Sequence, residues 1–97
     1  MLTHIVFFRM KPESQQRKGE LVSVLRAMKE QIDELAEIEV GIDVSRSPRS
    51  WDAALVTRFR SSADLAAYRV HPDHKKVLEL VAEICSETSV VDYEAEE

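Results

Sequence analysis

The sequence has little cysteine, little glycine and no concentrated positive charge, and each shortage narrows the possible functions. Its 97 residues include one cysteine, so no disulfide can form within the chain. The two glycines form neither a phosphate-binding loop nor a dinucleotide-binding motif. The 13 Lys and Arg residues are scattered among 18 Asp and Glu, without a basic block. We therefore expect no nucleic-acid partner.

Long apolar runs are also missing. The apolar stretch near the N-terminus carries His4 and Arg9 and is too short for a signal peptide or a membrane span. We expect one domain over residues 1–97 that is cytoplasmic, makes no membrane contact and binds no cofactor. The single thiol, Cys85, continues the apolar face of a predicted helix, so we expect it to be buried and unreactive.

Residues 2–10 are predicted to form a strand that is apolar on both faces. One face carries Ile5 and Phe7, and the other carries Leu2, His4, Val6 and Phe8. A strand of this kind lies between two layers, because neither of its faces suits water.

A long helix and a hairpin are predicted next. From Ser14 to Ala36, apolar residues recur at helical spacing, as Leu21, Val24, Leu25, Met28, Ile32 and Leu35. Residues 38–44 alternate between apolar and polar, as in a half-buried strand. Residues 46–50 form a loop before a third strand at residues 53–59, and the two strands are expected to pair.

The second half contains a broken helix. Ser61 and Asp64 resemble a capping box that opens a short helix. Pro72 disfavours a helical His71, so this helix is predicted to end near Val70 and another to begin at Pro72. Apolar residues continue the second helix to Ile84, residues 89–93 form a last strand, and residues 94–97 form an acidic tail expected to fray.

The predicted order, βαββαβ, is that of the ferredoxin-like α+β fold, in which a four-stranded antiparallel sheet carries its helices on one face. The other sheet face would expose Ile5 and Phe7. We expect two chains to pack sheet against sheet into a homodimeric α/β barrel, with a solvated sheet as the alternative.

Several motifs together resemble the stress-responsive A/B barrel (Dabb) family. They are the opening strand from His4 to Lys11, the strand from Glu39 to Val44, the pair Trp51 and Asp52, and the segment from Tyr68 to His74. The resemblance covers nearly the whole chain. It implies a ferredoxin-like fold that pairs into a homodimeric barrel, and it implies no single activity.

One plant relative, olivetolic acid cyclase, closes a linear polyketide by aldol chemistry without a cofactor. The resemblance places its strand histidine on His4, its helix tyrosine on Tyr68 and its catalytic histidine on His74. A further tyrosine on its first helix would fall near Leu25 or Arg26, where this chain has none. That departure argues against transferring the same substrate.

These three side chains have both a catalytic and a structural interpretation. In the catalytic one, His74 removes a proton next to a carbonyl, Tyr68 donates a hydrogen bond to the enolate oxygen, and His4 orients a carbonyl or a water. In the structural one, His4 bonds a backbone carbonyl, Tyr68 packs in the core and His74 lies on the surface. His71 is expected to cap the second helix, and no metal site is expected because the spacing matches no zinc motif.

Three functions remain open at this point. The favoured one is a dimer that binds a small, apolar, carbonyl-bearing molecule between sheet and helices without turning it over. The second is a cofactor-free cyclase or isomerase of polyketide-like substrates with His74, Tyr68 and His4 as its site. The third is a structural stress-protein dimer, since fold alone does not determine function.

Overall fold

A computed structural model describes residues 1–95 of the protein. It contains four strands, three α-helices and one 3₁₀ helix. In chain order these are β1 (Leu2–Met10), η1 (Pro12–Arg17), α1 (Lys18–Gln31), β2 (Glu37–Ile42), β3 (Ala53–Phe59), α2 (Ser62–Val70), α3 (Pro72–Ile84) and β4 (Cys85–Glu94).

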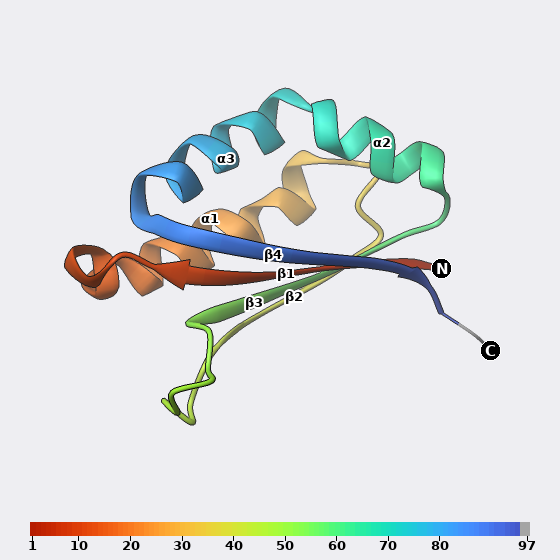
Figure 1. Cartoon of the computed structure of the whole chain (residues 1–97). Coiled ribbons are helices and arrows are strands. Elements are labelled where there is room, and N and C mark those ends of the chain that lie inside the picture. The colour runs from red at the N-terminus through yellow and green to blue at the C-terminus, as the bar shows by residue number, and fades with distance from the viewer. Residues whose placement is uncertain (96–97) are drawn as a thin grey trace.

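The strands form one antiparallel sheet in the order β2-β3-β1-β4, and the helices lie together on one of its faces (Figure 1). This arrangement confirms the predicted ferredoxin-like α+β fold. The central strand β1 pairs with β3 on one side and β4 on the other, so the first and last strands of the chain are neighbours.

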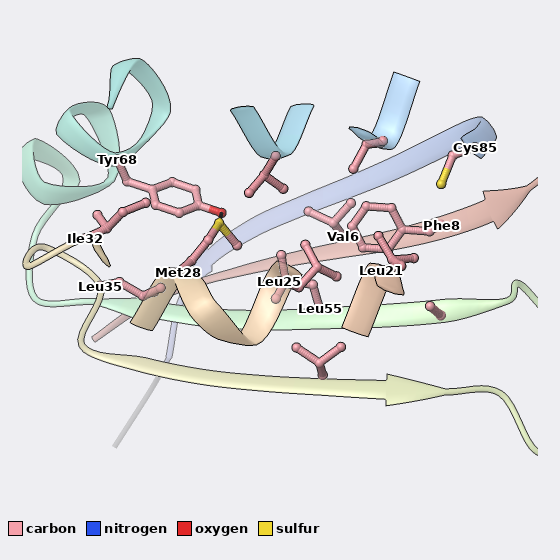
Figure 2. Close-up of a cluster of buried hydrophobic side chains, with 14 of the residues drawn as sticks. Val6, Phe8, Leu21, Leu25, Met28, Ile32, Leu35, Leu55, Tyr68 and Cys85 are labelled. Carbon is pink, nitrogen blue, oxygen red and sulfur yellow. Dashed lines mark hydrogen bonds between the residues drawn. The ribbon is translucent and has the colours of Figure 1, made fainter. Parts of the chain in front are cut away.

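The hydrophobic core lies between the sheet and the helices. Leu21, Leu25 and Met28 of α1 are fully buried against the inward side chains of β1 and β3 (Figure 2). Val77, Val81 and Ile84 close the core from α3. Both helices are amphipathic, and burial of their apolar stripes is the main force that holds them on the sheet.

The first helix is shorter than predicted. Residues 12–17 form the 3₁₀ helix η1, and α1 ends at Gln31 rather than Ala36. Gly19 and the missing N-terminal cap explain the late start, since neither favours α-helix nucleation. Ile32 is already extended, yet Ile32 and Leu35 stay buried because the chain turns toward the sheet here.

The last strand is longer than predicted and begins without a loop. β4 starts at Cys85, directly after α3, so Cys85 belongs to a strand and not to the helix face. It is buried as expected, and burial raises the pKa of its thiol. Glu94 still belongs to β4, and the Ala95 N–H donates to the carbonyl of Met1. The rest of the predicted tail, residues 96–97, lies outside the described residues.

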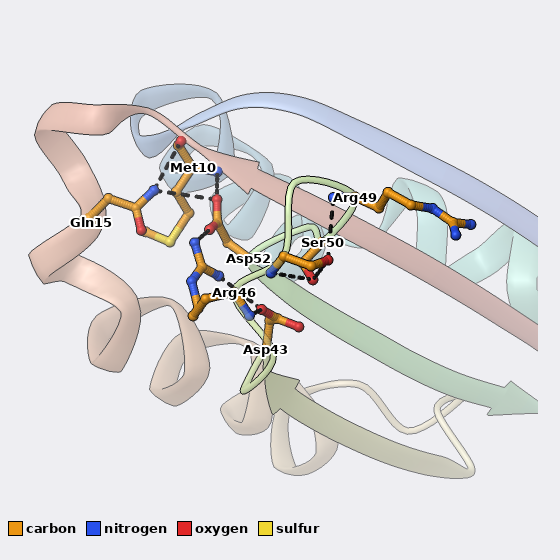
Figure 3. Close-up of polar contacts among 8 residues, drawn as sticks. Met10, Gln15, Asp43, Arg46, Arg49, Ser50 and Asp52 are labelled. Carbon is orange, nitrogen blue, oxygen red and sulfur yellow. Dashed lines mark hydrogen bonds and ion pairs between the residues drawn. The ribbon is translucent and has the colours of Figure 1, made fainter.

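The hairpin of β2 and β3 is confirmed, although β2 spans Glu37–Ile42 and not residues 38–44. Its loop is held by the buried Asp52, whose carboxylate accepts the Met10 backbone N–H at 2.7 Å and the Arg46 guanidinium at 2.8 Å (Figure 3). Burial alone would raise the pKa of Asp52, but these hydrogen bonds lower it below its usual value. Asp52 therefore ties the hairpin loop to the end of β1.

The outward face of the sheet is apolar at its centre. Phe7, Val91 and Tyr93 expose 43%, 60% and 45% of their surface, and Ile5 lies between them. In addition, no helix within residues 1–95 is long and apolar enough to cross a lipid bilayer.

Candidate functional site

The break between α2 and α3 orients His74. The side chain of His71 accepts the Asp73 N–H, which confirms the predicted cap. The Asp73 N–H is therefore not available to the carbonyl of Arg69, near the end of α2. The His74 Nδ1 lies 3.1 Å from that carbonyl oxygen. A carbonyl can only accept, so Nδ1 carries the hydrogen and a neutral His74 keeps an unprotonated Nε2.

His4 is held by a carboxylate and not by the backbone carbonyl of the structural interpretation. β1 and β4 pair in a register that sets His4 opposite Asp92, and the His4 Nδ1 bonds the Asp92 Oδ1. The other oxygen, Oδ2, accepts from Arg69 Nη2 at 2.8 Å. Because the carboxylate accepts at Nδ1, the Nε2 of a neutral His4 is also an acceptor. A neutral His4 would thus orient a hydroxyl or a water, and not a carbonyl.

Tyr68 lies between the two imidazoles. Its ring centroid is 6.1 Å from that of His4 and 4.3 Å from that of His74. The residue is 1% exposed, and within residues 1–95 its hydroxyl bonds only the Met28 sulfur, at 3.7 Å (Figure 2). A thioether is a weak acceptor, so the Tyr68 hydroxyl is a buried donor without a strong partner among the described residues.

A cavity of about 190 Å³ adjoins all three side chains. Its inner wall consists of buried apolar side chains from β1, α1, β3 and α3, and its outer end is bordered by exposed side chains of α2, α3 and β4. The outer end includes Arg69, Leu78 and Val90. The cavity therefore runs from the core to an opening between the helices and the edge strand.

Burial makes the site less polar than its residue types suggest. It lowers the pKa of His74, an effect that the Arg69 carbonyl opposes and that the nearby His4, Arg69 and His71 reinforce. Burial also raises the pKa of Tyr68. At neutral pH, His74 is thus a neutral base and Tyr68 a neutral donor, and their ring centroids lie 4.3 Å apart.

Two polar residues of the site, Asp92 and Arg69, were not predicted from the sequence. Asp92 is an acidic residue within the otherwise apolar stretch from Val90 to Tyr93. This contrast is the one feature of the sequence that indicates a special role for Asp92. Its partner becomes evident only from the β1–β4 register. Within residues 1–95, no three His, Cys, Asp or Glu side chains gather closely enough to hold a metal ion.

The family assignment follows from a comparison of the whole chain. The profile of the Stress responsive A/B Barrel Domain, Dabb, matches residues 2–95. The chain belongs to the Dabb family. The predicted resemblance is therefore confirmed, and the motifs that carried it lie in β1, β2, the hairpin loop and the α2–α3 joint.

Other Dabb proteins and similar folds are known. A stress-response A/B barrel domain-containing protein of Arabidopsis thaliana is 30% identical over 99% of this Dabb chain. The chain spans 37% of the length of that relative. A dimeric ferredoxin-like protein of unknown function from Bacteroides fragilis is 28% identical with a TM-score of 0.74, covering 97% of this chain and 95% of its own.

A known enzyme shares the fold of this Dabb domain. Hydroxynitrile lyase from Passiflora edulis superposes with a TM-score of 0.87 over 99% of this chain and 94% of its own. Its sequence is 22% identical, so this likeness concerns the fold.

The lowered pKa of His74 predicts how the stability of this Dabb domain changes with pH. Below about pH 6.5, the His74 imidazole binds a proton in the unfolded chain, whereas the buried imidazole of the folded protein stays neutral down to a lower pH. Acidification therefore favours unfolding. His74→Gln can keep a donor to the Arg69 carbonyl but cannot titrate. We expect the free energy of unfolding in urea to fall less between pH 7.5 and 5.5 in this variant than in the wild type. An equal fall in both proteins would contradict the buried, neutral His74.

Proposed function

We propose that the protein binds a small, apolar, carbonyl-bearing molecule in the cavity between sheet and helices. The observation that carries this proposal is the Tyr68 hydroxyl, a buried donor whose only partner within residues 1–95 is the Met28 sulfur. A carbonyl oxygen is a far better acceptor than a thioether. A ligand carbonyl beside Tyr68 would satisfy this donor while the apolar walls bury the rest of the molecule.

The size of the cavity limits the ligand. A dry protein cavity of roughly 150 Å³ takes a benzene molecule. A cavity of about 190 Å³ therefore suits one ring with a short substituent. This estimate favours a compact ligand over the extended polyketide of the alternative function.

Ligand binding can be tested with acetophenone, a ring that carries one short carbonyl group. We expect it to shift the NMR signals of His74 and Tyr68 and to bind more weakly when Val81→Phe fills the cavity. Leu80→Phe is the matched control, because Leu80 lies on α3 but does not line this cavity. Equal binding by both variants, or no shifts in the wild type, would count against this cavity as the site.

A second candidate function is proton transfer without a cofactor. In this reaction, His74 Nε2 takes a proton from the carbon next to the ligand carbonyl, and the electron pair of the broken C–H bond moves onto the oxygen. Tyr68 stabilises the enolate oxygen by donating a hydrogen bond, and Asp92 fixes the orientation of His4. The unprotonated Nε2 and lowered pKa of His74 favour this candidate. The hydroxynitrile lyase with the same fold is an enzyme, but a shared fold supports this candidate only by analogy.

Proton transfer can be tested without knowing the substrate. In D₂O, we expect the protein to speed deuterium exchange into the methyl group of acetophenone, as followed by NMR. His74→Gln should slow the exchange by roughly 100-fold and Tyr68→Phe by a smaller factor. The wild-type rate should rise with pH as His74 loses its proton, at a pH below the usual imidazole range. Full exchange activity in His74→Gln would rule out this base, and ligand binding would then remain the function.

We further propose that two chains pack through the outward sheet face. Phe7, Val91 and Tyr93 form an exposed apolar surface there, which is uncommon in a monomer. The similar Bacteroides fragilis protein is described as dimeric, which supports the proposal. A stress-protein dimer without a ligand is the remaining alternative, and it would dimerise but fail both acetophenone tests.

Dimerisation is tested by placing a charge in this surface. We expect wild-type protein to sediment as a dimer at micromolar concentration and Phe7→Asp to sediment as a folded monomer, because a carboxylate cannot be buried there without a partner. Glu39→Gln, at the exposed β2 edge of the same face, is the control that should remain dimeric. A monomeric wild type would contradict the proposed pairing.

A further inference from the structure

Arg69 stands at the opening of the cavity with most of its donors unused. Its side chain is 52% exposed and borders the cavity next to the exposed Leu78 and Val90. A guanidinium has five N–H donors, and here one nitrogen, Nη2, donates to Asp92 Oδ2. Within residues 1–95, the guanidinium bonds no other acceptor.

The contact with Asp92 occupies only part of the Arg69 guanidinium. The Asp92 Oδ1 pairs with His4 Nδ1 and the Asp92 Oδ2 with Arg69, so both carboxylate oxygens have a partner. The remaining Arg69 donors can therefore take a second acceptor without breaking the Asp92 contacts. A guanidinium recognises a planar carboxylate better than it recognises any neutral oxygen.

The lining of the cavity favours an anion at this opening. No Asp or Glu side chain of residues 1–95 lines it, and Arg69 is its permanently charged group. The other exposed side chains at the opening, Leu78, Thr88 and Val90, carry no charge. A carboxylate placed beside Arg69 would share this cation with Asp92, whose Oδ2 lies 2.8 Å from Arg69 Nη2, and would leave an attached apolar group inside the cavity.

We propose that Arg69 selects small carboxylates, binding the carboxylate at the opening while the apolar, carbonyl-bearing part of the molecule fills the cavity beside Tyr68 and His74. This inference rests on the proposed ligand-binding function and names the chemical class of the ligand. Arg69 acts as a specificity-determining residue.

Benzoate and benzamide test the proposal because they have nearly the same shape and differ in charge. Their dissociation constants are measured by NMR titration at moderate ionic strength. We expect the wild type to bind benzoate about tenfold more tightly than benzamide, as one charge-assisted hydrogen-bonded pair would give. Arg69→Met should bring this ratio close to one, because the benzoate carboxylate then loses its cationic partner.

Two further variants complete the experiment. Asp92→Asn removes the negative charge beside Arg69 but keeps an oxygen that can accept from Nη2 and hold Arg69 in place, so we expect it to bind benzoate more tightly. Arg60→Met removes an exposed arginine that does not line the cavity, and it should keep the wild-type ratio.

The outcomes separate this inference from the proposed function. If both probes bind the wild type equally, or if Arg69→Met keeps the preference for benzoate, the carboxylate inference is wrong and ligand binding stands. If neither probe binds but acetophenone does, the carboxylate inference is wrong and the proposed function stands, whereas both fail if acetophenone does not bind either. Weaker benzoate binding by Asp92→Asn would also contradict the role of the free Arg69 donors.

Discussion

The antiparallel register between β1 and β4 is the constraint on which the site depends. It sets His4 opposite Asp92, with both side chains on the face that the helices cover. Side chains alternate between the two faces of a sheet, so a shift of one residue would turn either partner toward the outward face. The register thereby determines the hydrogen bond of His4, the position of Arg69 through Asp92, and one wall of the cavity.

Local patterns predicted the parts of the fold that depend on local chemistry. Pro72 and His71 predicted the break between α2 and α3, because proline restricts the residue before it and a polar side chain there can cap the next helix. The amphipathic periodicity predicted α1 and α3. The same periodicity placed the end of the first helix too late, because Ile32 and Leu35 remain buried although they follow the last residue of α1.

The polar half of the site depends on contacts between distant segments, and these were not evident from the sequence. The start of β4 could not be predicted because it consists of exposed polar residues of an edge strand, Ser86, Glu87 and Thr88, which lack the alternation of a half-buried strand. The β1–β4 pairing also contains a register shift between Arg9 and Met10 that no local pattern shows. Tyr68 and His74 were identified because one short segment contains them both. Asp92 was missed because its partner lies 88 positions away.

The sheet separates two different surfaces of this Dabb domain. Its inward face carries a small cavity with two imidazoles and a phenol, and its outward face carries exposed apolar side chains suited to a second chain. A domain of this size gains much of its stability from buried area, so pairing through one face would leave the other free to hold a cavity.

The Asp92 carboxylate and the Arg69 carbonyl fix the tautomers of neutral His4 and His74, so that Nε2 is the unprotonated nitrogen of each ring. Long-range ¹H–¹⁵N NMR spectra of the two imidazoles at alkaline pH test it most directly. We expect a protonated Nδ1 and an unprotonated Nε2 in both rings, and we expect Asp92→Asn to change the His4 signals. A hydrogen on Nε2 of either ring would contradict the claim.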